Sequence, residues 1–190
     1  MRIWIYSGHA VAILSLAVAG CSAARGPQAG GPAPSSPEPE PVAMAPLAAQ
    51  EAELRAALAP TAAVVVSSPG ALELWYPVRL AFAPDSTELL PAGIAMLDLV
   101  AQSLRSYGHT TVIVAVYTDA IGSSESNQRQ SELRAAALVE ALESRGVAPA
   151  RLIARGLGES AQLEAPSTAE GRDLNRRVQL VITRAEVQGS

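Results

Sequence analysis

Residues 111–136, TVIVAVYTDAIGSSESNQRQSELRAA, decide the fold of this chain. Thr111 to Tyr117 form a β-branched run without a strongly polar interruption, which is typical of a strand in the middle of a sheet. A turn-forming segment follows, and from near Ser126 to Arg145 the apolar residues recur at helical spacing. The stretch therefore predicts a strand, a loop and a helix in succession, which is the building unit of an α/β fold.

The flanking sequence extends this unit to a whole domain. A turn at Ser67–Gly70 separates two short apolar runs and predicts a β-hairpin, while Pro77 predicts that its strand lies at a sheet edge or contains a bulge. Strand character continues to Phe82, and a helix is expected from about Pro91. Two more strands are predicted at residues 151–155 and 178–183. Strands alternating with helices predict a two-layer α/β sandwich with helices on one face.

The apolar spacing also assigns the buried face of each helix. A stop signal at Gly146, Val147 and Pro149 ends the second helix. The positions predicted to face the core are Leu90, Ile94, Leu97, Ala101 and Leu104 in the first helix, and Ser131, Ala135, Leu138, Val139 and Leu142 in the second.

Two charged residues frame the loop of the central unit. Asp119 follows the strand, and Arg134 lies fifteen positions later on the helix. A zwitterionic ligand such as the free end of an amino acid needs this pair, a carboxylate for its ammonium and a planar guanidinium for its carboxylate. A structural ion pair between the two side chains is the alternative, and the residues alone leave both open.

A second polar segment, EGRDLNRRVQL at residues 170–180, places Asn175, Arg176 and Arg177 directly before an apolar strand pattern. Together the two segments resemble the OmpA-like peptidoglycan-binding domain, the domain shared by peptidoglycan-associated lipoproteins (Pal). The loop Gly156–Glu159 and the spacing of Phe82, Ser86 and Leu89 also match that family. The resemblance covers roughly residues 75–184 and implies the order β-α-β-α-β-(short helix)-β in a mixed sheet.

The resemblance implies a ligand for the site. In the family, an aspartate at the position of Asp119 binds the ammonium of diaminopimelate in the peptidoglycan stem peptide, and an arginine at the position of Arg134 binds the neighbouring carboxylate. Thr118, Asn127, Asn175 and Arg176 complete the expected ligand-binding set. No catalytic residue, metal or other cofactor is implied.

The two arginines of the second segment are expected to differ. We expect Arg176 to pair with a carboxylate and support the pocket, and Arg177 to be the more solvated of the two.

The chain also departs from the family pattern. Val116 and Tyr117 stand where the family usually has Gly-His, and Gln130 replaces a usual leucine. We expect the Tyr117 ring to be able to lie beside the ligand, whereas the lost glycine would crowd the backbone and weaken binding. His109 precedes the strand and is expected to be a solvated turn residue.

The amino terminus predicts the cellular compartment. Residues 1–20 resemble a secretory signal of lipoprotein type, with small residues before Cys21, the one cysteine of the chain. This resemblance implies cleavage before Cys21 and its acylation, and Ser22 implies sorting to the outer membrane, with the folded domain in the periplasm. An ordinary signal peptide and an uncleaved anchor are the alternatives.

The remaining organisation follows from composition. Residues 21–46 are expected to comprise the lipidated amino terminus, as the resemblance to a lipoprotein signal implies, and a linker. The linker is indicated by the seven prolines and three glycines that fall within residues 25–46. Such a segment, extended at about 3.1 Å per residue, reaches roughly 70 Å. Residues 47–60 predict a short helix that docks on the domain or extends the tether, and residues 61–186 the OmpA-like domain.

Composition and motifs also bear on other functions. The formal net charge is −4, and no basic cluster with interleaved aromatic residues appears, which argues against nucleic acid as a partner. An enzyme is disfavoured because no catalytic or zinc motif is recognised, although Asp119 with Glu125 or Glu159 could form a carboxylate pair for glycan hydrolysis. A module that has lost peptidoglycan binding and docks a periplasmic protein is the main alternative function.

Overall fold

The computed structural model describes residues 47–185, so the signal segment, Cys21 and the proline-rich linker lie outside the described residues. The described chain forms a five-stranded sheet in the order β1-β2-β5-β3-β4. Its strands are β1 (Val64–Ser68), β2 (Ala71–Pro77), β3 (Thr110–Tyr117), β4 (Leu152–Gly158) and β5 (Arg177–Arg184). Strands β3 and β4 pair in parallel and the other pairs are antiparallel, so the sheet is mixed.

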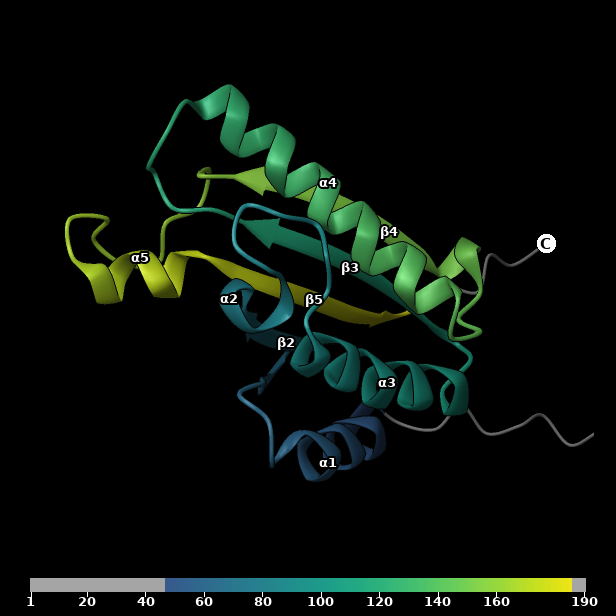
Figure 1. The fold of residues 1–190 in the computed structure, drawn as a ribbon. Helices are drawn as coiled ribbons and strands as arrows, with labels where there is room; N and C mark the ends of the chain where they lie inside the picture. The colour runs from purple at the N-terminus through teal and green to yellow at the C-terminus, as the bar shows by residue number, and fades with distance from the viewer. Residues whose placement is uncertain (1–46, 186–190) are drawn as a thin grey trace, which may run out of the picture. The chain divides into compact units, whose positions relative to one another are not determined.

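Helices cover one face of this sheet (Figure 1). They are α1 (Leu47–Leu58), α2 (Val78–Ala81), α3 (Pro91–Ser106) and α4 (Ser124–Glu143). The turn η1 (Pro149–Arg151) precedes β4, and the short helix α5 (Ala169–Asn175) lies at the end of the sheet where β5 begins (Figure 1). Alternate strand residues enter the core beneath the helices: Leu72, Leu74 and Tyr76 of β2, Val112, Val114 and Val116 of β3, and Val178, Leu180 and Ile182 of β5. The predicted two-layer α/β architecture and its element order are confirmed.

The ends of α4 follow local capping rules. The Ser123 side chain accepts a hydrogen bond from the Ser126 backbone N–H at 3.2 Å, which caps the first turn. Gly146 adopts a φ of 84°, and the Val147 N–H donates to the Leu142 carbonyl at 3.2 Å. Val147 is also buried, so the predicted stop signal is confirmed.

Helix α1 belongs to the core of the domain. Leu54 and Leu58 are fully buried in the main hydrophobic cluster. The Gln50 side chain is buried as well and donates to the Ser103 hydroxyl on α3 at 3.4 Å. Because a helix of this length is marginal alone, these contacts with the domain are what hold it in place.

Three local expectations are wrong. Strand β2 is internal rather than at an edge, and Pro77 is tolerated because it ends the strand beyond Trp75, where pairing with β1 stops. Residues Val78–Ala81 form a helical turn instead of continuing a strand to Phe82. Ile94 is 38% exposed, because α3 turns Met96 and Val100 toward the core beside Leu97.

Among the helices of residues 47–185, none combines the length and apolar character needed to cross a membrane.

Candidate functional site

A cavity of about 400 Å³ opens where β3 ends and α4 begins. The loop after β3 contributes one wall, α4 a second, and the segment from α2 to residue 85 a third. Its lining residues are Val78, Arg79, Phe82, Ala83, Pro84, Asp85, Thr118, Asp119, Ile121, Asn127, Gln130, Arg134 and Arg176. The fold thus brings together four of the expected ligand-binding residues from the strand–loop–helix unit and one, Arg176, from the second segment.

Asp119 is buried at one side of this cavity, with 7% of its surface exposed. Its Oδ1 accepts a hydrogen bond from the Ile121 backbone N–H at 3.1 Å. Its Oδ2 forms an ion pair with the Arg176 guanidinium, which is the carboxylate partner expected for that arginine. A carboxylate offers about four lone-pair sites, so two remain for a further donor.

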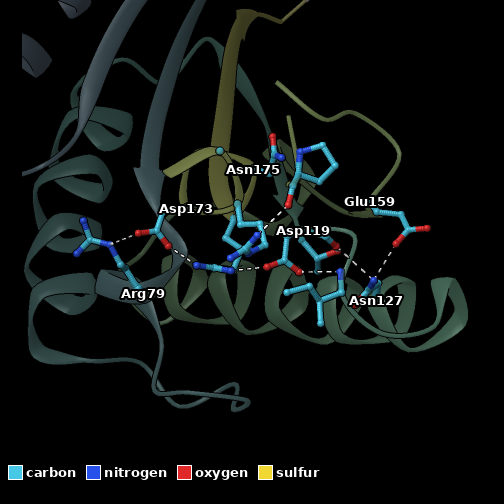
Figure 2. A network of polar contacts seen from close by, with 12 residues as sticks. Arg79, Asp119, Asn127, Glu159, Asp173 and Asn175 are labelled. Carbon is cyan, nitrogen blue, oxygen red and sulfur yellow. Dashed lines mark hydrogen bonds and ion pairs between the residues drawn. The ribbon is translucent and has the colours of Figure 1, made fainter. Parts of the chain in front are cut away.

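Arg176 connects Asp119 to a row of charges that begins at the cavity, and the labelled residues Asp119, Asp173 and Arg79 of this row can be followed in Figure 2. It also pairs with Asp173, and Asp173 lies 3.9 Å from the Arg79 guanidinium. On the other side of Asp119, the Asn127 amide donates to the Glu159 carboxylate at 2.9 Å. Opposite charges therefore alternate from Arg79 through Asp173 and Arg176 to Asp119, so the Asp119 carboxylate is paired with a cation.

Arg134 lies on α4 and is also buried, with 6% exposed. Its Nε donates to the Ser86 backbone carbonyl at 2.9 Å, and its guanidinium carbon lies 5.5 Å from the centre of the Phe82 ring. Burial lowers the pKa of Arg134, and the nearby Asp85 carboxylate partly opposes that shift. The guanidinium is therefore a desolvated cation, and an anion brought into the cavity would stabilise it.

Asp119 and Arg134 line the same cavity without pairing with each other, because the Asp119 carboxylate pairs with Arg176. Within residues 47–185, the hydrogen bond to Ser86 is the only one that the Arg134 side chain donates. A guanidinium carries five N–H donors, so most of those of Arg134 have no partner in the described part of the chain. The structural ion pair considered from the sequence is therefore not observed.

Thr118 and Asn127 shape the loop between the two charged residues. The Thr118 hydroxyl donates to the Asp119 carbonyl at 2.9 Å, and the Asn127 amide donates to the same carbonyl at 3.3 Å. Both side chains are buried and line the cavity. Both side chains therefore hold the backbone of Asp119. Asn127 does not cap α4, because the Ser123 side chain does so.

Asn175 does not reach the cavity. It is fully buried, and its Oδ1 accepts hydrogen bonds from the backbone N–H groups of Leu163 at 2.7 Å and Glu164 at 3.1 Å. Its Nδ2 donates to the Glu164 carbonyl at 3.0 Å. The amide is thus committed to the loop before α5, and the ligand contact expected for Asn175 is not supported by its position.

The expectations for Arg177 and Tyr117 are wrong for a common reason. Both side chains lie on the sheet face away from the helices, where the Arg177 guanidinium carbon sits 3.7 Å from the Tyr117 ring centre and 5.5 Å from that of Trp75. Arg177 is only 6% exposed, and burial lowers its pKa. Arg177 is therefore less solvated than Arg176, and the Tyr117 ring lies on the opposite side of the sheet from the core-facing Val116 rather than in the cavity.

The sequence did not reveal three charged residues at or beside the cavity. Arg79 and Asp173 join the site through the charge row, and Asp85 approaches Arg134 from a turn. Asp85 has a φ of 49°, a left-handed conformation that is uncommon outside glycine and is tolerated best by asparagine and aspartate. No sequence spacing rule connects this turn residue to an arginine on α4.

The structure also places the remaining residues that were considered from the sequence. His109 is exposed in a turn, as expected. The Glu159 carboxylate accepts from Asn127, and Glu125 is exposed in the first turn of α4. Among the described residues, no group of three or more His, Cys, Asp or Glu side chains is arranged to hold a metal ion.

The mixed sheet, the helices on one face and the charged cavity after the central strand are the features expected of an OmpA-like domain. Residues 81–176 match the OmpA family, and the chain belongs to that family.

The chain is also similar in sequence to individual proteins. The chain is 37% identical over 134 residues to the probable lipoprotein YiaD of Escherichia coli, covering 70% of this chain and 61% of that protein. It is 36% identical over 103 residues to the peptidoglycan-binding protein ArfA of Mycobacterium tuberculosis, covering 54% of this chain and 32% of that protein. The chain therefore spans between about a third and three fifths of these relatives.

A solved structure agrees with the family assignment. The crystal structure of the peptidoglycan-associated lipoprotein from Burkholderia pseudomallei superposes with a TM-score of 0.51 at 30% sequence identity. The match covers 55% of this chain and 88% of that one.

Proposed function

We propose that this protein is an outer-membrane lipoprotein that binds peptidoglycan non-covalently through the diaminopimelate of the stem peptide, and so tethers the outer membrane to the cell wall. The observation that carries the proposal is the cavity in which Asp119 and Arg134 are both buried but not paired with each other. The similarity to a probable lipoprotein supports the proposed lipid anchor, and the similarity to a peptidoglycan-binding protein supports the proposed ligand.

The two charged residues suit the free end of diaminopimelate. Its ammonium can donate to the lone pairs of Asp119 that Ile121 and Arg176 leave unused. Its carboxylate can accept from the terminal amino groups of Arg134, whose Nε is already held by the Ser86 carbonyl. Because the guanidinium is fixed on Phe82 and Ser86 before the ligand arrives, little side-chain entropy is lost on binding.

The ligand's charges give the sharpest test. Lysine-type peptidoglycan lacks the carboxylate that diaminopimelate presents beside the terminal ammonium, so it would leave Arg134 without its partner while still meeting Asp119. A hydrogen bond to a charged group contributes about 1.5–3 kcal/mol, so the diaminopimelate form should bind about 10- to 150-fold more tightly. We expect Asp119→Ala to weaken binding of both forms and Arg134→Ala to remove most of the preference.

Co-sedimentation with purified peptidoglycan of the two types measures this directly. Arg155→Ala on β4 and Glu140→Ala on α4 are matched controls, since both residues are exposed and lie outside the cavity. Equal binding of the two types by the unmodified protein, or full discrimination by Arg134→Ala, would show that Arg134 does not bind the carboxylate. Release of soluble fragments would instead indicate an enzyme, and absence of binding would favour the protein-docking alternative.

The membrane anchor is a separate part of the proposal. We expect Cys21, outside the described residues, to be the acylated first residue of the mature protein. Several acyl chains, at about 0.8 kcal/mol per buried methylene, make a stable anchor where a single chain would be marginal. Metabolic labelling with a fatty acid should mark the unmodified protein and not Cys21→Ser, and a labelled Cys21→Ser protein would exclude this residue as the acylation site.

A further inference from the structure

Gln130 is a cavity residue to which the ligand contacts described above give no role. It lies on α4 three residues after Asn127 and four before Arg134, and residues at these spacings share one helix face. It lines the cavity together with both of them and is half-buried. Its side chain is therefore placed between the part of the site that holds Asp119 and the part that holds the guanidinium.

The Gln130 amide has no hydrogen-bond partner among residues 47–185, in contrast to the other glutamines near the site. Gln128 donates to the Glu132 carboxylate at 2.7 Å and to the Gly156 carbonyl at 2.8 Å. Gln162 donates to the carbonyls of Thr118 at 3.3 Å and Glu159 at 3.0 Å. Those two amides hold the loops in place, whereas that of Gln130 is available to a molecule in the cavity.

The other uncharged polar side chains of the cavity lining, Thr118 and Asn127, already have partners. Thr118 and Asn127 hold the Asp119 backbone, and Arg176 pairs with the Asp119 carboxylate. Gln130 is thus the one uncharged polar side chain of the cavity lining without a partner in the described range. An amide is both a donor through its Nε2 and an acceptor through its Oε1, so it can meet a carboxylate or a carboxamide.

We propose that Gln130 determines ligand specificity by hydrogen-bonding the ligand's terminal carboxyl group beside Arg134, and that it lets the site also accept a ligand whose carboxyl group is a carboxamide. This proposal rests on the proposed binding of diaminopimelate. Toward a carboxylate, Nε2 donates alongside the guanidinium. Toward a carboxamide, Nε2 donates to its oxygen while Oε1 accepts from its amino group.

Substitutions at Gln130 separate these contacts. Gln130→Leu removes the donor and the acceptor, and the loss of a neutral hydrogen bond should weaken either ligand form about 2- to 10-fold. Gln130→Glu keeps the acceptor but adds a negative charge. We therefore expect it to weaken binding of the carboxylate form at least about 10-fold, because the two negative groups repel each other. Binding of the carboxamide form should change by less than about 3-fold, because the charged acceptor makes a stronger hydrogen bond with the ligand's amino group and so offsets the lost donor.

The experiment uses the mature chain in detergent and isothermal titration calorimetry. The two probes are a soluble muropeptide with a tripeptide stem ending in diaminopimelate and the same molecule with the far carboxyl group as a carboxamide. Gln102→Leu on α3 is the matched control, because Gln102 is exposed and outside the cavity. Melting curves of all variants establish that they are folded.

The outcomes distinguish this inference from the function on which it rests. A selective loss of the carboxylate form in Gln130→Glu, with Gln102→Leu unchanged, supports it. Binding of both probes by Gln130→Leu within about twofold of the unmodified protein overturns it, even if Asp119→Ala and Arg134→Ala abolish binding. If the unmodified protein binds neither probe, the proposed function and this inference both fail.

Discussion

Replacing Arg177 by alanine should destabilise the domain more than replacing its neighbour Arg176. The Arg177 guanidinium is packed between the Tyr117 and Trp75 rings, 3.7 Å and 5.5 Å from their centres, and 6% of the residue is exposed. Its Nη1 donates to the backbone carbonyls of Ala161 at 3.1 Å and Asn175 at 3.4 Å. Truncation therefore removes stacking and charge-assisted hydrogen bonds and leaves a cavity.

The magnitude follows from these contacts. Stacking of a cation on an aromatic ring contributes about 0.5–2 kcal/mol, and a hydrogen bond from a charged group about 1.5–3 kcal/mol. Burial lowers the pKa of Arg177, which shows that the buried charge is itself costly. Removing that charge offsets part of the lost stability. We expect Arg177→Ala to reduce the free energy of unfolding by about 2–4 kcal/mol. For a domain of this size that corresponds to a fall in melting temperature of roughly 6–15 °C.

The same reasoning gives a smaller effect for Arg176. Its side chain is 36% exposed and pairs with Asp173, whose side chain is 48% exposed, so that ion pair contributes about 0–1 kcal/mol. The pair with Asp119 matters more, because the Asp119 side chain is 10% exposed and would lose its cationic partner. We expect a total loss of about 1–2 kcal/mol for Arg176→Ala.

Urea unfolding followed by circular dichroism measures both variants. Arg155→Ala is the control, since this exposed arginine should change the free energy of unfolding by less than about 0.5 kcal/mol. If Arg176→Ala lowers the free energy of unfolding as much as Arg177→Ala or more, the aromatic packing of Arg177 does not stabilise the domain by the expected amount.

Two further predictions concern the scaffold of the site. A Cβ at Gly156 would lie 2.2 Å from the Glu132 backbone nitrogen, whereas one at Gly108 would meet nothing within 4 Å. Gly156→Ala should therefore push α4 away from β4, lower the free energy of unfolding by about 1–3 kcal/mol or more, and weaken ligand binding. Gly108→Ala is the control and should change neither the stability measured in thermal melts nor the binding measured by co-sedimentation. Asn175→Ala should lower the free energy of unfolding by about 2–4 kcal/mol, because the Leu163 and Glu164 N–H groups lose their acceptor. The folded variant should keep its peptidoglycan affinity within about threefold. A large loss of affinity without a loss of stability would instead make Asn175 a ligand contact.

Much of the fold was predictable because its signals are local. The β-branched run of β3, the proline at the start of α3 and the Gly146 stop signal each act over a few residues, and each is observed. The short turn Val78–Ala81 escaped prediction because four residues carry no helical period. Pro77 was misjudged because a proline's tolerance depends on where the neighbouring strand ends, and only the pairing of β1 with β2 determines that.

Within the candidate site, the sequence by itself determined that Asp119 and Arg134 flank one loop, because a strand, a turn and a helix fix their separation. Only the tertiary structure decided their partners: Arg176 pairs with Asp119, and Ser86 holds Arg134. It also reversed the expected exposure of Arg176 and Arg177. Arg176 is the C-terminal capping residue of α5, whereas Arg177 is the first residue of β5. The Arg177 side chain is buried because aromatic residues of β2 and β3, which are distant in sequence, lie beside it.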